Sequence, residues 1–361
     1  MLSKEFSFKR INNYLKYFLN GDRLKRYATH LNYYPLFIEV EVTTNCILSC
    51  PGCARTIAPK EFLGHNTSLE TMQKIEPIFH YTRLVTFVGP FGDPFMSPNF
   101  WEFHHMAKAA GSQTMFFTNA MLMNSGHIDK LFSAKTDCIG FSLDSIEPKL
   151  YESIKKGTDF NKVMNIIRGV IAAKRRFKLK KPVIAINYVI QKKNIHELSE
   201  VVKFAAKEGI EKIWFTGLIC HNQESVDNSI FSIDRTRLDE SVRLVKKLGK
   251  RYGVGIRLPQ FNYPDVYRMC CAPWQTMSIY YNGDVCACTH FRFPKPYYFY
   301  VKGGKIIQGK IDYPALLMGN INEEGILKIW NNEKYQNLRS GIKDARANYP
   351  CRSCYYPYGW H

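Results

Sequence analysis

Between residues 36 and 217, short runs of β-branched and aromatic residues alternate with longer stretches of helical periodicity. The predicted strands are Phe37–Val42, Leu84–Val88, Thr114–Phe117, Cys138–Leu143, Val183–Ile190 and Lys212–Thr216. The predicted helices include Ser68–Phe79, Asn99–Ala110, Ile128–Ser133, Phe160–Phe177 and Ile195–Glu208. Such alternation indicates a parallel sheet, because each parallel connection requires a crossover. Six units are too few for a closed eightfold barrel, so the sequence predicts an α/β fold with an open, partial (β/α)6 barrel.

The pattern changes after about residue 255, where short strands, turn residues and cysteines dominate. Tyr281–Asp284 separates two short apolar runs and predicts a hairpin, and a helix-like segment follows at Glu324–Ser340. The helix predicted at Leu238–Tyr252 is expected to lead away from the barrel. We therefore expect an N-terminal helical extension at 1–35, the partial barrel at 36–255 and a small cysteine-rich α+β domain at 256–361.

The N-terminal 35 residues combine apolar and basic side chains in the pattern of one or two amphipathic helices. A helix that covers one end of the barrel is the preferred interpretation, and a membrane-surface anchor is the alternative. No run of about 18 apolar residues occurs, so we expect no membrane span. The N-terminus also lacks an export signal, which predicts a cytoplasmic protein.

The charge is strongly positive: 50 Lys and Arg against 31 Asp and Glu give +19. This balance favours phosphate-rich or anionic partners, although general solubility explains it equally simply. The basic run at 174–181 closes a predicted helix, and a solvated helix end is the preferred interpretation over a nucleic-acid patch. Nucleic acid is therefore the less favoured partner.

Nine of the eleven cysteines fall in three tight groups, at 46–53, 270–288 and 351–354. An odd number of cysteines in a chain of this size does not suggest a disulfide framework, whereas metal ligands cluster in this way. The two outside these groups are Cys138, which we expect to be a buried core thiol, and Cys220. The pair Cys220–His221 follows the sixth strand and is a candidate substrate-contacting or proton-handling group.

The first group, Cys46, Cys50 and Cys53, lies in the loop after the first strand, where α/β barrels build their active sites. A closed zinc site needs four protein ligands, and no fourth Cys or His follows within ten residues. Iron–sulfur clusters normally take four thiolates. Three thiolates would therefore hold a four-iron cluster with one iron open to an outside ligand.

This C-x3-C-x2-C spacing after a strand resembles the radical S-adenosylmethionine (SAM) superfamily. The resemblance implies that Cys46, Cys50 and Cys53 bind a [4Fe–4S] cluster whose open iron chelates SAM. Electron transfer would then cleave SAM to a 5′-deoxyadenosyl radical that abstracts hydrogen from a substrate carbon. One departure is that Gly52 replaces the aromatic residue that usually contacts the adenine, so adenine packing is expected from elsewhere.

Polar residues at later strand ends extend the resemblance. Gly89–Pro94 is similar to the family's Gly-Gly-Glu-Pro element, with Asp93 at the glutamate and Phe91 at the first glycine. The resemblance implies that Gly92 and Asp93 hold the SAM amino group. It further implies that Asn119, Ser142 and Asn187 contact the ribose and carboxylate. Strand alternation predicts that Asp144 points to the other face.

The C-terminal cysteines resemble the SPASM/twitch extension of radical SAM enzymes, with Gly283-x4-Cys288 preceded by Cys270 and followed by Cys351-x2-Cys354. The resemblance implies one auxiliary [4Fe–4S] cluster held by Cys270, Cys288, Cys351 and Cys354. The choice between Cys270 and Cys271, and participation of Cys286, stay open. A structural zinc site is the alternative for this set.

The predicted activity is that of a radical SAM oxidoreductase or maturase. Its substrate would be a peptide or a sugar-like small molecule, and a flavodoxin- or ferredoxin-like protein would supply the electron. The alternatives are an RNA-modifying radical SAM enzyme and a zinc-bearing RNA-binding protein, which the charge and the many aromatic residues would suit.

Overall fold

The computed structural model describes residues 2–19, 28–89, 91–259, 270–288, 297–302, 305–310 and 317–344. One sheet of ten strands runs through the molecule in the order β12-β9-β8-β1-β2-β3-β4-β5-β6-β7. Every pair formed among strands β1 to β8 is parallel, and the β8–β9 and β9–β12 pairs are antiparallel. The expected partial barrel is therefore confirmed, and the C-terminal hairpin continues its sheet.

The strands of the barrel are β1 (Phe37–Val40), β2 (Leu84–Phe87), β3 (Gln113–Thr118), β4 (Cys138–Ser142), β5 (Val183–Ile190), β6 (Lys212–Gly217) and β7 (Gly255–Arg257). The C-terminal strands of the sheet are β8 (Thr276–Ile279), β9 (Asp284–Cys286) and β12 (Leu317–Asn320). A separate two-stranded sheet pairs β10 (Tyr297–Lys302) with β11 (Lys305–Lys310). The seventh parallel strand was not predicted, because three residues are too few to show a period.

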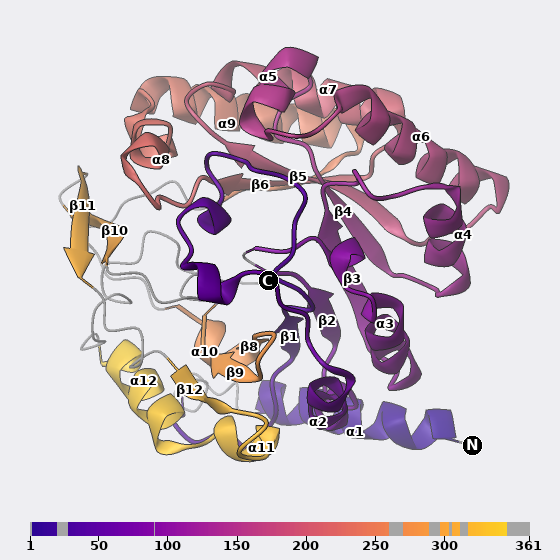
Figure 1. Cartoon of the computed structure of the whole chain (residues 1–361), viewed down its shortest axis with the longest axis vertical. Helices are drawn as coiled ribbons and strands as arrows, with labels where there is room; N and C mark the ends of the chain where they lie inside the picture. The colour runs from indigo at the N-terminus through magenta and orange to yellow at the C-terminus, as the bar shows by residue number, and fades with distance from the viewer. Residues whose placement is uncertain are drawn as a thin grey trace.

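The helices are α1 (Leu2–Leu19), α2 (Leu69–Phe79), α3 (Phe100–Ala109), α4 (Ser125–Ser133), α5 (Pro148–Ile154), α6 (Phe160–Arg176), α7 (Leu198–Glu208), α8 (Gln223–Asp227), α9 (Arg235–Tyr252), α10 (Ala272–Gln275), α11 (Ile326–Ile329) and α12 (Glu333–Lys343). Figure 1 shows the barrel helices around the outside of the curved sheet and the segment between β1 and α2 on its concave side. The expectation that the helix ending at Tyr252 leads away from the barrel is wrong. Helix α9 packs against α7, and β7 then returns to the sheet.

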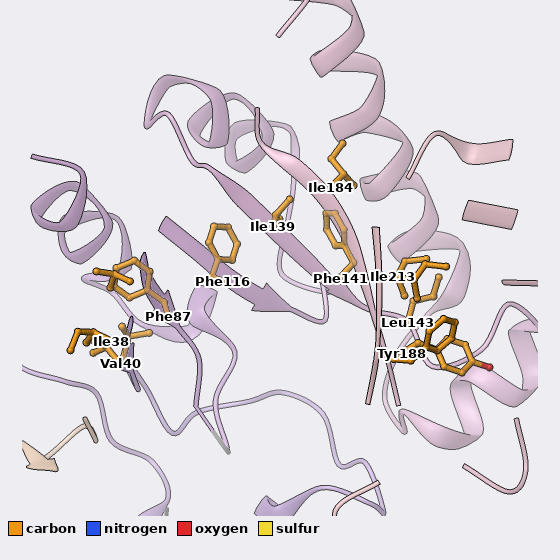
Figure 2. Close-up of a cluster of buried hydrophobic side chains, with 14 of the residues drawn as sticks. Ile38, Val40, Phe87, Phe116, Ile139, Phe141, Leu143, Ile184, Tyr188 and Ile213 are labelled. Atoms are coloured by element: carbon orange, nitrogen blue, oxygen red, sulfur yellow. The ribbon is translucent and has the colours of Figure 1, made fainter. Parts of the chain in front are cut away.

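Side chains alternate across the barrel strands, and one set is buried beneath the helices. Figure 2 shows Phe87, Phe116, Ile139, Phe141 and Ile213 in this outer core. All five side chains are 0% exposed. The intervening residues of the same strands therefore face the concave side, because successive side chains point to opposite faces of a sheet. That face carries the candidate site.

Candidate functional site

The residues Cys46–Cys53, here called the cysteine loop, follow β1 at the carboxyl end of the parallel strands. All three cysteines are half-buried. The amide of Cys53 donates to the carbonyl of Cys50 at 3.1 Å, which turns the chain back on itself. The same cysteine caps a short 3₁₀ helix, Ala54–Thr56. The loop thus carries three thiols at the edge where parallel α/β sheets bind ligands.

Nitrogen donors lie close to the sulfur atoms of Cys46 and Cys53. The Leu48 amide lies 3.5 Å from Sγ of Cys46, and the Arg55 amide lies 3.4 Å from Sγ of Cys53. The side-chain amide of Asn119, which follows β3, also donates to Sγ of Cys46, at 3.7 Å. Hydrogen-bond donors at sulfur favour the thiolate over the thiol, and the thiolate is the form that binds metal.

The electrostatic surroundings of the thiols combine burial with two nearby cations. Burial raises the pKa of all three thiols above the ordinary value, and each thiol also raises the pKa of another. Lys155 opposes this effect at Cys50 and Cys53, and Arg55 opposes it at Cys46 and Cys53. The three sulfurs therefore share one electrostatic environment with two positive charges, which suits an anionic metal–thiolate group.

The turn after β2 packs directly on the chain that leads into the cysteine loop. A Cβ atom on Gly92 would lie 2.0 Å from the carbonyl oxygen of Thr43, so only glycine allows this approach. The Asp93 amide donates to the carbonyl of Asn45 at 2.8 Å. The family resemblance assigned Gly92 a role at SAM, and the structure shows a backbone reason for glycine at this position.

Asp93 is 3% exposed and joins several loops through its carboxylate. Its Oδ2 accepts hydrogen bonds from the Thr118 hydroxyl and the Asn119 amide, both at 2.8 Å, and its Oδ1 accepts from the Phe95 amide at 3.1 Å. Burial raises the pKa of Asp93, and these hydrogen bonds oppose the rise. Two carboxylate oxygens can accept about four hydrogen bonds, so one acceptor position is not used by these three donors.

The other predicted polar residues lie on the concave face of neighbouring strands. Ser142 ends β4 and pairs in register with Asn187 of β5, which pairs in turn with Trp214 of β6. All three are half-buried. The rings of Phe117 and Trp214 meet edge to face at 5.4 Å over Gly140, which leaves them space on this side. Sequence reasoning missed this aromatic pair, whose signal is its alternation with the buried residues of β3 and β6.

Two charged residues at the site were also missed. Lys155 follows α5 and forms an ion pair with Asp144, with Nζ and Oδ2 2.9 Å apart. The expectation that Asp144 faces away is wrong, because its carboxylate is close enough to Cys50 to raise the pKa of that thiol. Residues two apart share a face in a strand, so Asp144 follows Ser142 toward the concave side. Arg55 had no sequence signal beyond its place two residues after Cys53.

The loop after β6 reaches the cysteine loop from the other side. A Cβ atom on Gly52 would lie 3.2 Å from Cδ1 of Leu218, so an aliphatic side chain stands where the family usually has an aromatic. Cys220 is 1% exposed and its thiol faces the Ser225 carbonyl at 3.7 Å. The neighbouring His221 is held through its amide by the Ser225 hydroxyl at 2.7 Å. The cysteine expected in the core, Cys138, is only half-buried, at the opposite end of β4.

Four C-terminal cysteines are described. Cys270 and Cys271 precede α10, Cys286 ends β9, and Cys288 follows it. Cys286 is buried, whereas the other three are half-buried. Burial raises the pKa of the Tyr335 phenol, and Cys286 and Cys288 contribute to that rise, so both lie near this tyrosine. The remaining predicted ligands, Cys351 and Cys354, lie outside the described residues.

Helix α12 fixes this cysteine-bearing part to the rest of the sheet through Arg339, which is 0% exposed. Its guanidinium donates to the carbonyls of Pro273 and Thr29 at 2.9 Å and of Trp330 at 2.8 Å. It also lies over the Trp330 ring, 4.4 Å from the centroid. Burial lowers the pKa of Arg339 to about 10. The Arg339 side chain therefore joins three segments that are far apart in the sequence.

Comparison with known proteins decides the family. Residues 40–205 match the radical SAM superfamily, and residues 270–355 match the SPASM iron–sulfur cluster-binding domain. The chain belongs to the radical SAM superfamily. As a radical SAM enzyme with a SPASM domain, it uses SAM and [4Fe–4S] clusters.

Several relatives of this radical SAM enzyme cover most of its length. A tungsten-containing aldehyde ferredoxin oxidoreductase cofactor-modifying protein from Pyrococcus furiosus is 24% identical over 331 residues, 88% of this chain and 86% of the relative. A PqqA peptide cyclase from Gluconobacter oxydans is 22% identical, over 89% of this chain and 82% of the cyclase. The solved structure of Streptococcus suis SuiB bound to S-adenosylmethionine shares the fold, with a TM-score of 0.63, 18% identity, and coverage of 88% of this chain and 70% of SuiB. SuiB has also been solved bound to its precursor peptide SuiA, with a TM-score of 0.61.

Among the described helices of this radical SAM enzyme, none is both long enough and apolar enough to span a bilayer.

Proposed function

We propose that Cys46, Cys50 and Cys53 hold the [4Fe–4S] cluster that binds SAM. The observation that carries this assignment is that one loop at the carboxyl end of the sheet holds three thiols that interact electrostatically with one another, with N–H donors and the cations Lys155 and Arg55 beside them. Arg55 provides a further observation on whether the site suits a cluster and SAM. Its Nε is buried and makes no hydrogen bond to the described residues. An unsatisfied buried guanidinium donor beside three thiols suits an anionic group bound at this position.

The cofactors carry the difficult chemistry: when bound, the cluster supplies an electron, and SAM supplies a 5′-deoxyadenosyl radical that removes hydrogen from a substrate carbon. The protein has to orient SAM. We assign the SAM ammonium to the unused acceptor position of Asp93, beside Asn119. We assign the SAM carboxylate to Arg55, whose free Nε donor lies in the short helix that directly follows the cluster ligands. These assignments give each charged end of SAM a partner of opposite charge.

The concave face would orient the rest of SAM and the substrate. The Ser142 hydroxyl and Asn187 amide stand side by side on this face and offer donors and acceptors to the ribose hydroxyls. The Leu218 side chain beside Gly52 offers an apolar contact for the adenine, in place of the missing aromatic. The Phe117–Trp214 pair adds a half-buried aromatic wall that would contact substrate and keep water from the reacting carbon.

We propose a peptide as the substrate class, modified or oxidised at a carbon. This proposal is supported by two relatives, since PqqA peptide cyclase takes its name from a peptide and SuiB has been solved with a precursor peptide. A small organic cofactor is the second candidate, because the relative from Pyrococcus furiosus is named as a cofactor-modifying protein. The electron donor would be a flavodoxin- or ferredoxin-like protein.

For the C-terminal part, we propose one auxiliary [4Fe–4S] cluster held by Cys270, Cys288, Cys351 and Cys354, in a domain that begins near residue 256. The match to an iron–sulfur cluster-binding domain over 270–355 supports this, because it includes all four cysteines. Cys286 is buried in β9, so we leave it out of the ligand set. Cys271 is the alternative to Cys270.

The ligand assignments can be tested on the full chain after anaerobic reconstitution with iron and sulfide. Two four-iron clusters predict about eight irons per chain. A Cys46/Cys50/Cys53 triple alanine variant should retain about four irons and lose reductive cleavage of SAM to 5′-deoxyadenosine. Cys138→Ala is the matched control, because this thiol lies at the other end of β4, and it should keep both properties. Retention of SAM cleavage in the triple variant would refute the assignment.

The substrate proposal needs a separate experiment. Incubation of the reduced enzyme and SAM with candidate peptides from neighbouring genes should give a peptide product with an altered mass. Deuterium at the attacked carbon should then appear in 5′-deoxyadenosine. Modification of a small cofactor, with no change in any peptide, would favour the second candidate.

A further inference from the structure

Helix α1 is fastened to the amino ends of the barrel strands by one of its faces. The half-buried guanidinium of Arg10 donates to the carbonyls of Thr82 and Ala110, both at 2.8 Å, and of Phe79 at 3.2 Å. Asn13 is 3% exposed and exchanges hydrogen bonds with the Tyr34 backbone at 2.8 and 3.2 Å. The expectation of a helix that covers one end of the barrel is therefore what the structure shows. These contacts also fix the rotation of the helix about its axis.

The opposite face of α1 is apolar and exposed. Its members are Phe8, Ile11, Leu15, Phe18 and Leu19, with exposed fractions of 70%, 53%, 52%, 62% and 76%. At 3.6 residues per turn these five positions fall within an arc of about 100° on the helix surface. They are five of the twelve large hydrophobic side chains that are exposed among the described residues. We call this surface the apolar face of α1.

Basic side chains border the apolar face of α1 on both sides. Lys9 and Lys16 are exposed and follow one edge, since they are seven residues apart and share a face. Arg83 is exposed at the other edge, where its guanidinium donates to the Tyr14 hydroxyl at 3.0 Å. Residues 1–27 carry seven Lys and Arg against two Asp and Glu, a net charge of +5.

We propose that the apolar face of α1 docks on the surface of an anionic lipid bilayer, with the helix lying in the plane of the interface. An apolar arc bordered by lysine and arginine is the pattern of interfacial helices, whose binding combines apolar insertion with attraction to anionic headgroups. A second copy of this chain suits the surface less well. It would bring the same basic border, and a chain of net charge +19, against itself.

The position of α1 is compatible with activity in the docked state. Its contacts lie before β1, β2 and β3, whereas the cysteine loop follows β1 at the other end of the sheet. Figure 1 shows α1 beside α2 at the lower edge of the view. Docking through the apolar face of α1 would therefore leave the cysteine loop facing away from the bilayer and open to substrate.

The test is co-sedimentation of the full-length, cluster-loaded enzyme with vesicles of phosphatidylcholine alone and of phosphatidylcholine with 30% phosphatidylglycerol. We expect binding to the anionic vesicles in 0.1 M salt, and much weaker binding in 0.5 M salt. A Phe8→Ser/Ile11→Ser/Leu15→Ser variant should bind at least tenfold more weakly. Its matched control is Leu69→Ser/Leu179→Ser/Leu244→Ser, which removes three exposed leucines elsewhere and should bind as the parent does.

A variant that removes charge separates electrostatic attraction from apolar insertion, because it leaves the apolar face of α1 unchanged. Lys9→Gln/Lys16→Gln should weaken binding roughly fivefold for each lysine in 0.1 M salt, with little effect in 0.5 M salt. Circular dichroism should show every variant folded. Equal binding of the parent and the Phe8/Ile11/Leu15 variant would overturn the proposal. So would a concentration-dependent dimer that this variant abolishes, because the apolar face of α1 would then be an interface between copies.

Discussion

The buried ion pair between Lys155 and Asp144 offers the sharpest test of how the cysteine loop is supported. The two side chains are 15% and 3% exposed, and their charged atoms lie 2.9 Å apart. In a Lys155→Met variant the Asp144 carboxylate would keep one described hydrogen bond, from the Val189 amide at 2.8 Å. The substitution therefore leaves a buried charge without its cation.

Breaking a buried ion pair from one side costs about 3–5 kcal/mol of folding free energy. The remaining Val189 hydrogen bond and the partial exposure of Lys155 place the expected loss at the lower end, about 3 kcal/mol. An Asp144→Asn/Lys155→Met double variant buries no unpaired charge and keeps an acceptor for Val189. It should lose only about 1 kcal/mol, so the double variant is expected to be more stable than the single one by about 2 kcal/mol.

The assay is urea unfolding of the iron-free chain under anaerobic conditions, followed by tryptophan fluorescence. Lys203→Met is the matched control, because Lys203 pairs with Glu200 at an exposed site, with exposed fractions of 47% and 54%. That variant should change the free energy of unfolding by less than about 1 kcal/mol. A Lys155→Met variant as stable as the parent, or a double variant no more stable than Lys155→Met, would refute the reasoning.

The same substitution should also affect the metal site. The carbonyl of Lys156, next in the chain, accepts a hydrogen bond from the Ser49 amide at 3.0 Å, which fixes the middle of the cysteine loop. Lys155 also lowers the pKa of Cys50 and Cys53. We therefore expect Lys155→Met to retain less iron on dilution than Lys203→Met does, measured by iron content after gel filtration.

Three further predictions concern other parts of the structure. Gly92→Ala should destabilise the fold by about 3 kcal/mol and reduce the iron content, because the new Cβ would lie 2.0 Å from the Thr43 carbonyl oxygen. The control is Gly325→Ala, which has open space around its Cβ and should be near neutral in urea unfolding. Burial lowers the pKa of His104 to about 4, so the unfolded chain takes up a proton below about pH 6.5 that the folded protein does not. Between pH 7 and pH 5 the free energy of unfolding should therefore fall by about 2 kcal/mol in urea titrations. The His104→Gln variant should lose less over the same pH range. Arg339→Lys should lower the free energy of unfolding by about 2 kcal/mol or more, because one ammonium cannot reach the carbonyls that the guanidinium binds, and an unchanged urea midpoint would contradict this.

Much of the barrel could be predicted from the sequence because its strands alternate residues that must be buried with residues that need not be. Strand β5 was predicted with its observed bounds, Val183–Ile190, and the other five predicted strands end within two residues of theirs. Strand β7 was missed because its three residues are held by pairing with β6, and pairing between distant segments leaves no local pattern. The joining of the C-terminal hairpin to β1 was missed for the same reason.

The candidate site was predictable where residue type and spacing coincide. The three cysteines of the first loop are visible from spacing alone, and Asn119 was found because it directly follows a predicted strand. Lys155 and Arg55 could not be found in this way, since a lysine after a helix and an arginine in a loop are ordinary surface residues in a sequence. Their importance comes from burial beside thiols, which depends on how α5 and the cysteine loop pack together.

Charged side chains have different roles at the two ends of the sheet, and this difference explains where they are placed. At the amino ends of the strands, the Arg10 side chain donates to backbone carbonyls at the ends of α2 and α3. Its guanidinium therefore serves to hold α1 in place. At the carboxyl ends, the cations Lys155 and Arg55 lie beside thiols whose burial alone would keep them protonated. A charge placed there lowers the cost of the thiolate form, and a metal cluster needs that form. The same residue type thus supports structure at one end and ligand chemistry at the other, and only the three-dimensional neighbours of each charge distinguish the two roles.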